Sequence, residues 1–217
     1  MEEYASEQEQ VDELKKVVRE NAPWAIGGVI LGGLLYFAYN QYQSWLDQKA
    51  HTGSQKYELV IEALSKKDPT AAMKQLTELR NDYARSPFAD QAALAIARYD
   101  AEAAQWNDAQ TLLTGVVEKT HDAALKEVAI LRLARVERAM GHRDEALATL
   151  AKAAGGRDDA AILEIKGDVL ADAGNPSAAR EAYTKALSSA VAGIVNKDDI
   201  ELKLNVLAAN ERQGKTP

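Results

Sequence analysis

Cysteine is absent from this chain of 217 residues, and aromatic residues make up only 6% of it. Without cysteine there is no disulfide scaffold, thiolate metal site or cysteine nucleophile. The scarcity of aromatic residues argues against a β-sandwich or barrel, whereas 40 alanines favour closely packed helices. The 26 basic residues are outnumbered by 33 acidic ones, which argues against nucleic acid as the main partner. The composition therefore predicts an all-α protein with no nucleic-acid partner.

Charged side chains are also missing from one continuous segment, residues 21–46, although 27% of the chain is charged. A helix over residues 22–42 would span roughly 31 Å, which matches a bilayer core of about 30 Å. Interfacial aromatic residues stand at its two ends, namely Trp24, Tyr36, Tyr39, Tyr42 and Trp45. We therefore predict a transmembrane signal anchor at residues 22–42, which we call the anchor segment.

Two other readings of the anchor segment fit the sequence less well. A buried helix of a soluble protein would carry four glycines at a cost of roughly 3–4 kcal/mol relative to alanine. A cleaved signal peptide would have a shorter apolar run, and it would be followed by small residues at the cleavage site. Here Tyr39, Asn40 and Tyr42 occupy those places instead.

Basic residues near the anchor segment predict its orientation. Lys15, Lys16 and Arg19 precede it, whereas only Lys49 and Lys56 follow closely. Since basic residues favour the cytoplasmic side, we expect a cytoplasmic tail at residues 1–21 and a periplasmic domain at residues 43–217. This topology is that of a single-pass protein of the bacterial inner membrane.

Two features of the N-terminal region predict local structure. Apolar residues of the tail recur at helical spacing, which predicts a helix there. This tail helix is expected to end near Asn21, because Pro23 disfavours the α conformation in the residue before it. Within the anchor segment, Gly28 and Gly32 form a small-xxx-small pair that would allow close approach of another membrane helix.

Three stretches of the remaining chain resemble one another and predict repeated helix pairs. They are residues 105–113, 142–150 and 175–183, and their matched alanines stand 37 and 33 residues apart. Small residues precede each matched alanine and a large apolar residue follows it. The nine matched residues are Ala97, Ala109, Leu113, Ala134, Ala146, Leu150, Gly167, Ala179 and Tyr183. The pattern is typical of a helix–turn–helix unit of about 34 residues, with small residues where the helices cross.

The ends of this array are predicted from weaker signals. Asp68 and Asn175 each precede a proline, as an N-cap precedes the first residue of a helix. The first of these predicts a divergent fourth unit in which Ala72 and Leu76 take the matched roles. Residues 198–212 are expected to cap the other end of the array through Ile200, Leu202, Leu204, Val206 and Leu207.

The repeat resembles the tetratricopeptide repeat, although Ala93, Ile130 and Leu163 replace its early aromatic residue. The whole chain is similar to the YfgM family of ancillary SecYEG translocon subunits, through the stretches MEEYASEQEQVDELKK, GGVILGG and AILRLARV. This resemblance implies an inner-membrane location and association with SecYEG and a periplasmic chaperone of the PpiD type. It also implies a role in passing emerging secretory proteins to periplasmic chaperones. The expected fold is an all-α chain with one transmembrane helix followed by a tetratricopeptide-like α-solenoid.

No constellation of residues suggests catalysis. The three histidines, His51, His121 and His142, lie far apart and have no acid or second histidine at metal-ligand spacing. The GGVILGG stretch has glycines but follows no predicted strand, so it is not a phosphate-binding loop. We expect no enzyme activity, no metal and no cofactor.

A binding groove is the remaining candidate site. Tetratricopeptide stacks bind through the first helix of each pair, and this resemblance implies groove positions at Leu94, Arg98, Leu131, Arg135, Arg138, Glu164 and Asp168. The alternative is that the arginines pair with acids on neighbouring helices. The lysine and asparagine clamp for C-terminal carboxylates is not present at these positions.

Two other roles remain open from the sequence alone. One is a structural anchor that dimerises through Gly28 and Gly32. The other is a regulator whose cytoplasmic tail contacts a soluble signalling protein.

Overall fold

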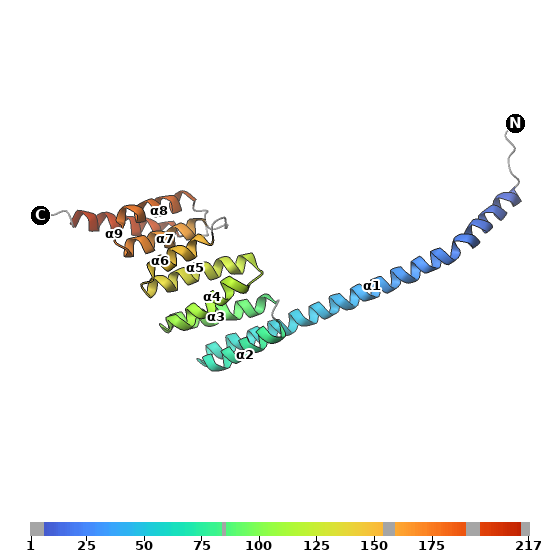
Figure 1. The fold of residues 1–217 in the computed structure, drawn as a ribbon, viewed down its shortest axis with the longest axis horizontal. Coiled ribbons are helices and arrows are strands. Elements are labelled where there is room, and N and C mark those ends of the chain that lie inside the picture. The colour runs from blue at the N-terminus through green and yellow to red at the C-terminus, as the bar shows by residue number, and fades with distance from the viewer. Residues whose placement is uncertain (1–6, 84–85, 154–158, 190–195, 214–217) are drawn as a thin grey trace, which may run out of the picture. The chain divides into compact units, whose positions relative to one another are not determined.

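The computed structural model describes residues 7–83, 86–153, 159–189 and 196–213, which form nine α-helices (Figure 1). The chain divides into two compact units, Met1–Thr52 and Gly53–Pro217, and we call the second the repeat domain. The helices are α1 (Glu7–Ser65), α2 (Pro69–Asp82), α3 (Pro87–Glu102), α4 (Trp106–Lys119), α5 (Ala123–Ala139), α6 (Arg143–Ala151), α7 (Asp159–Asp172), α8 (Pro176–Ser189) and α9 (Lys197–Gln213). The all-α fold expected from the composition is confirmed.

Helix α1 is continuous over 59 residues, and this corrects the prediction of a separate tail helix that ends near Asn21. The predicted boundaries at residues 21 and 42 therefore both lie inside α1. Proline biases the residue before it away from the α conformation, but that bias can be overcome when helix propagates from both sides. The part of α1 from Gly53 onward belongs to the repeat domain.

The repeat domain consists of successive helix pairs, as the sequence spacing predicts. All nine matched small and large residues are buried, and so are Ala72 and Leu76 of the divergent first unit. That unit pairs the end of α1 with α2, and Lys56 of α1 bonds Glu78 of α2 at 2.5 Å. Consecutive helices then lie side by side along the domain (Figure 1). The predicted α-solenoid organisation is confirmed.

The turns between paired helices use the chemistry that the sequence indicates. The Asp68 carboxylate accepts a hydrogen bond from the Ala71 N–H at 2.9 Å, and the Asn175 side chain accepts one from the Ala178 N–H at 3.2 Å. Gly141 and Gly174 end their helices with φ of 81° and 73°. Ala104 stands at the equivalent position of the first of these turns with φ of 57°, a left-handed conformation that costs a residue with a Cβ about 1–2 kcal/mol.

The end of the array is covered by α9 only in part. Ile200 is fully buried, and Leu204 and Leu207 pack against the same cluster around Tyr183. Leu202 and Val206, which were also expected to pack, are 60% and 50% exposed. The reason is the helical period, because residues two apart lie about 200° apart around a helix and cannot all face one neighbour.

Two successive units bury a carboxyl group at the same place, three residues after the matched small residue of α3 and α5. These residues are Asp100 and Glu137, both within the packed interior. Burial is the main cause that raises the pKa of each carboxyl above its usual range. The Thr149 hydroxyl donates to one Glu137 oxygen at 3.1 Å, while the other oxygen has no hydrogen-bond partner among the described residues.

The Glu137→Gln variant is expected to be more stable than the wild type at pH 7, by about 1 kcal/mol, the scale on which a buried unsatisfied group costs stability. Because the folded pKa of Glu137 is raised, the unfolded chain loses this proton first as pH rises above about 4.3. The free energy of unfolding of the wild type therefore falls as pH rises from about 4.3 to the folded pKa of Glu137. Above the folded pKa the full destabilisation is present.

Urea denaturation of the full chain in detergent, followed by circular dichroism at several pH values, measures this difference. The stabilisation should shrink as pH falls below about 4, where both states of the wild type become protonated. Glu118→Gln removes an exposed charge from α4 and serves as the control, with little change expected. A Glu137→Gln variant that is less stable than wild type at pH 7 would contradict the prediction.

Candidate functional site

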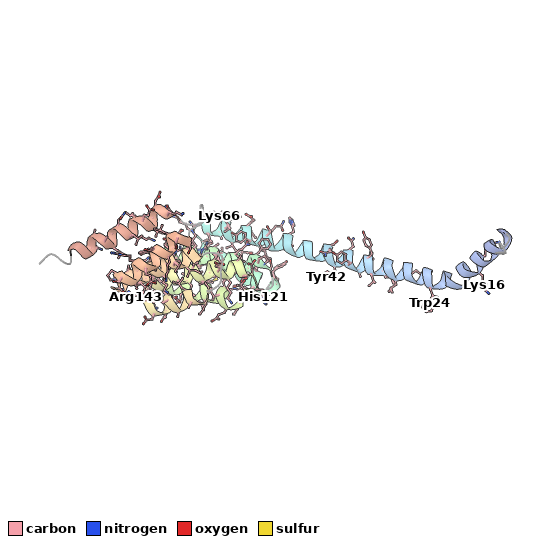
Figure 2. The ribbon with its side chains drawn as sticks, turned by 90° about the horizontal axis from the view of Figure 1, so that it is seen from above. Lys16, Trp24, Tyr42, Lys66, His121 and Arg143 are labelled. Carbon is pink, nitrogen blue, oxygen red and sulfur yellow. The ribbon has the colours of Figure 1, made fainter. Side chains whose placement is uncertain are left out.

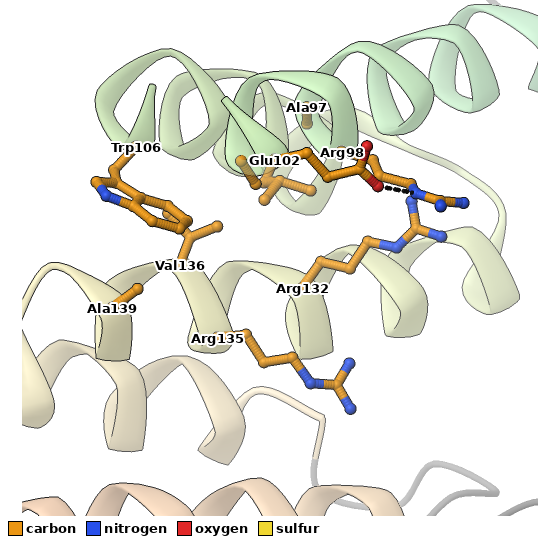
Figure 3. Close-up of a pocket in the computed structure, with 10 residues that line it drawn as sticks. Ala97, Arg98, Glu102, Trp106, Arg132, Arg135, Val136 and Ala139 are labelled. Atoms are coloured by element: carbon orange, nitrogen blue, oxygen red, sulfur yellow. Dashed lines mark hydrogen bonds and ion pairs between the residues drawn. The ribbon is translucent and has the colours of Figure 1, made fainter. Parts of the chain in front are cut away.

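A groove with a volume of about 570 Å³ lies between α3 and α5, with the start of α4 at one end (Figure 3). Helices α3 and α5 are the first helices of successive pairs, which is where the sequence predicts a groove. We use "the groove" for the space lined by Ala97, Arg98, Ala101, Glu102, Trp106, Leu113, Arg132, Arg135, Val136 and Ala139.

One end of the groove is apolar. Trp106 is the first residue of α4 and follows directly on the turn that contains Ala104, so this turn sets where the indole stands. Val136 and Ala139 face it from α5 (Figure 3). Ala97, whose side chain must be small where the helices cross, also lines the groove. This end can accept a large apolar side chain.

The other end of the groove is basic, because Arg98 of α3 and Arg132 and Arg135 of α5 all line it (Figure 3). The Arg98 side chain is 72% exposed and pairs with Glu102 one turn along its own helix, at 2.7 Å. Arg132 is half-buried and donates to the Leu94 carbonyl at 3.1 Å. Arg135 is exposed and has no ion pair within the described part of the chain.

Of the groove residues predicted from the sequence, the structure brings Arg98 and Arg135 together here. Leu94 and Leu131 are only 5% and 9% exposed and pack within the core, so neither presents its side chain to an open surface. Each lies one helical turn before a groove residue and therefore shares its face, but packing covers it at that level of the stack, where Leu131 joins a buried cluster with Ile165 of α7.

Arg138, Glu164 and Asp168 are brought together in a different place, an ionic cluster that joins α5, α7, α8 and α9. Asp168 accepts from Arg138 at 3.0 Å and from the Tyr183 hydroxyl at 2.7 Å. Lys203 of α9 bonds both Glu164 and Asp168, at 2.5 and 3.2 Å. For Arg138, the alternative of pairing with acids on a neighbouring helix is therefore the observed one.

The pKa shifts of the groups in this ionic cluster agree with their pairing. The hydrogen bond to Asp172 raises the pKa of Arg138, and burial alone would lower it. Burial would also lower the pKa of Lys203, but its bonds to Glu164 and Asp199 outweigh burial and raise it. Burial and the bond to Asp168 raise the pKa of the Tyr183 hydroxyl, so it stays protonated as a donor. These charges are paired with one another across neighbouring helices.

Sequence reasoning missed two residues that shape the groove, Arg132 and Trp106. Arg132 lies within the AILRLARV stretch, and its spacing of three from Arg135 predicts that both share one face of the helix. A tryptophan directly after an interhelical turn, among few aromatic residues, was the signal for Trp106.

The first compact unit holds the other predicted contact site, Gly28 and Gly32. A Cβ added at either position would meet no atom within 4 Å. Apolar side chains around them are well exposed, including Leu34, Leu35 and Phe37, and the aromatic rings of Trp24 and Tyr42 project from α1 (Figure 2). Among the residues that the structure describes, no helix combines the length and hydropathy needed to cross a membrane. The membrane span at residues 22–42 stays a prediction.

Within the described ranges, no three acidic, histidine or cysteine residues gather as a metal site would require. His51, His121 and His142 are all exposed. The Nδ1 atom of His142 lies 3.1 Å from a carboxylate oxygen of Glu145, one turn along α6. The groove, with one apolar and one basic end, has a geometry suited to binding.

The similarity to known proteins extends over nearly the whole chain. The family described as a tetratricopeptide repeat-like domain matches residues 15–209. A protein of Escherichia coli (strain K12) named "Ancillary SecYEG translocon subunit" is 29% identical over 211 residues, which cover 96% of this chain and all of the relative.

Two further relatives carry the same name. The protein of Neisseria gonorrhoeae is 26% identical, with 94% of this chain and 98% of the relative covered. That of Haemophilus influenzae is 27% identical, with 86% and 91% covered. The similarity therefore includes the N-terminal region as well as the repeats.

Proposed function

The chain belongs to the tetratricopeptide repeat-like domain family and is similar along its length to ancillary SecYEG translocon subunits, and from this premise we propose the following function. The protein is a non-enzymatic subunit of the bacterial inner membrane that associates with SecYEG and helps pass emerging secretory proteins to periplasmic chaperones. The observation that carries the proposal is similarity over at least 86% of this chain to three relatives of that name.

The N-terminal region supports a placement in the membrane with the tail in the cytoplasm. Residues 21–46 contain no charge, and most of the described side chains from residue 30 to 42 are exposed and apolar or aromatic. A helix that is apolar around its circumference requires a surrounding apolar phase or partner. Lys15, Lys16 and Arg19 before this segment favour a periplasmic repeat domain. From that side the domain would meet a chaperone of the PpiD type.

The anchor segment is the part that we expect to contact the translocon. Gly28 and Gly32 lie on one face of α1, and their surroundings within the chain are open. Among the described residues, a side chain added at either position would therefore enter open space. A loss of association after substitution by leucine would report on a partner helix and not on misfolding.

Purification of tagged SecYEG from detergent-solubilised membranes should recover the wild-type chain, but at least several-fold less of the Gly28→Leu/Gly32→Leu variant. Gly27→Leu is the matched control, because Gly27 is equally open but lies about 100° away around the helix. A chain without residues 1–46, exported by a cleavable signal, should not be recovered. Recovery of that truncated chain at the wild-type level, or failure to recover the wild type, would refute the proposal.

A further inference from the structure

The basic end of the groove holds three guanidinium groups and one carboxylate, that of Glu102. Arg98 forms an ion pair with that carboxylate, and Arg132 donates a hydrogen bond to the backbone carbonyl of Leu94. Arg135 has no acidic partner within the described residues. Guanidinium groups bind carboxylates through paired, charge-assisted hydrogen bonds. The groove therefore offers donors for an anion that this part of the chain does not supply.

Repulsion between the three guanidinium groups adds to the preference of the groove for an anion. Burial lowers the pKa of Arg132, and the neighbouring charges of Arg98 and Arg135 lower it further. A carboxylate placed among the three groups would offset that repulsion. Since Arg98 and Arg135 are exposed, the attraction should weaken as salt is raised.

The apolar end of the groove sets a second requirement for the ligand, which is an apolar group. Trp106, Val136 and Ala139 form a wall on the side away from the arginines (Figure 3). Aromatic side chains in such places anchor a partner by burying a large apolar side chain. A ligand that satisfies both ends must carry an acidic and an apolar group along one chain.

We propose that the groove binds an extended polypeptide segment in which an internal aspartate or glutamate stands close to a large apolar side chain. The choice of an internal side chain rests on the proposed function, because a chain emerging from a translocon presents internal segments before its C-terminus. It also agrees with the absence, at the positions predicted for it, of a lysine and asparagine clamp for terminal carboxylates.

The test uses the full chain in detergent and a fluorescein-labelled peptide, acetylated and amidated, with one phenylalanine and one glutamate two residues apart in a glycine–serine background. Fluorescence anisotropy should show saturable binding that weakens as salt is raised. Replacing the peptide glutamate by glutamine should weaken binding about ten- to hundredfold, the range expected for a charge-assisted contact. Replacing its phenylalanine by serine should weaken it about tenfold.

Variants of the protein locate the site. Arg135→Gln changes an exposed side chain that makes no ion pair in the described region, so it should weaken binding about tenfold without affecting folding. Trp106→Ala should also weaken binding. Arg143→Gln removes the same charge from an exposed position on α6, outside the groove, and should leave binding unchanged (Figure 2). Arg135→Glu should in addition favour a peptide with lysine in place of glutamate.

The proposal is overturned if the glutamine peptide binds as tightly as the glutamate peptide, or if Arg135→Gln and Arg143→Gln behave alike. Binding only of a peptide with a free C-terminal carboxylate would likewise overturn it. Co-purification of each variant with SecYEG separates this inference from the proposed function. Arg135→Gln should still be recovered with the translocon, and a failure of peptide binding alone leaves the membrane association intact.

Discussion

Replacing Gly167 by alanine is expected to destabilise the repeat domain by about 1–3 kcal/mol, although alanine is the better helix former by about 1 kcal/mol. Gly167 of α7 lies against the ring of Tyr183 from α8. A Cβ at this position would stand 2.5 Å from Cδ1 of that ring and closer still to Cε1. The ring is buried and bonded through its hydroxyl to Asp168, so it cannot move aside freely.

Gly115→Ala provides the matched control for this prediction. Gly115 lies within α4, and a Cβ there would meet only the end of Arg80, at 3.8 Å. This change should raise stability by up to about 1 kcal/mol, since only helix propensity is altered. Urea denaturation of the full chain in detergent compares the two variants. If both stabilise the protein, the close approach of α7 and α8 at Gly167 is wrong.

The second large effect is expected from Asp168→Ala, which should cost about 2–3 kcal/mol. The change leaves the buried Tyr183 hydroxyl without its acceptor, and an unsatisfied buried group costs about 1–3 kcal/mol. It also removes one partner each from Arg138 and Lys203. These two keep other acids, Asp172 and Glu164, and are partly exposed, so their share of the loss is small.

A double-mutant cycle with Tyr183→Phe tests this account, because the phenylalanine removes the hydroxyl but keeps the ring. The two changes together should cost about 0.5–3 kcal/mol less than their separate effects combined. Glu181→Ala removes an exposed acid whose pair with Lys185 lies on the surface of α8, and it should cost less than about 0.5 kcal/mol. Additive effects of Asp168→Ala and Tyr183→Phe would contradict the assigned hydrogen bond.

The repeat architecture was predictable because close helix crossings restrict residue size. Ala97, Ala134 and Gly167 are small at equivalent places, and the 37- and 33-residue spacing fixes the length of each unit. Gly141 and Gly174 likewise mark turns that need a left-handed residue. Such restrictions are local, and a single sequence displays them directly.

The candidate site was predictable only in part, because it depends on which neighbouring helices cover each face along its length. Groove positions carried over from the family placed Leu131 on the surface, whereas the neighbouring Arg132 lines the groove. Asp168 was assigned to the groove from the sequence, whereas it lies in the ionic cluster with Arg138, where Lys203 reaches it from α9, 35 residues later in the sequence. A contact of this kind depends on tertiary packing that no spacing rule supplies.

In the repeat domain, each helix packs mainly against helices one or two places away along the chain. Stability in such an array is close to a sum of nearest-neighbour interfaces, and folding can start at one end and propagate. In the proposed topology the tail stays in the cytoplasm and α2 emerges before α9, so the array would assemble pair by pair as it emerges. Because contacts between neighbours form quickly, little apolar surface would remain open to aggregation while the later helices are still in transit.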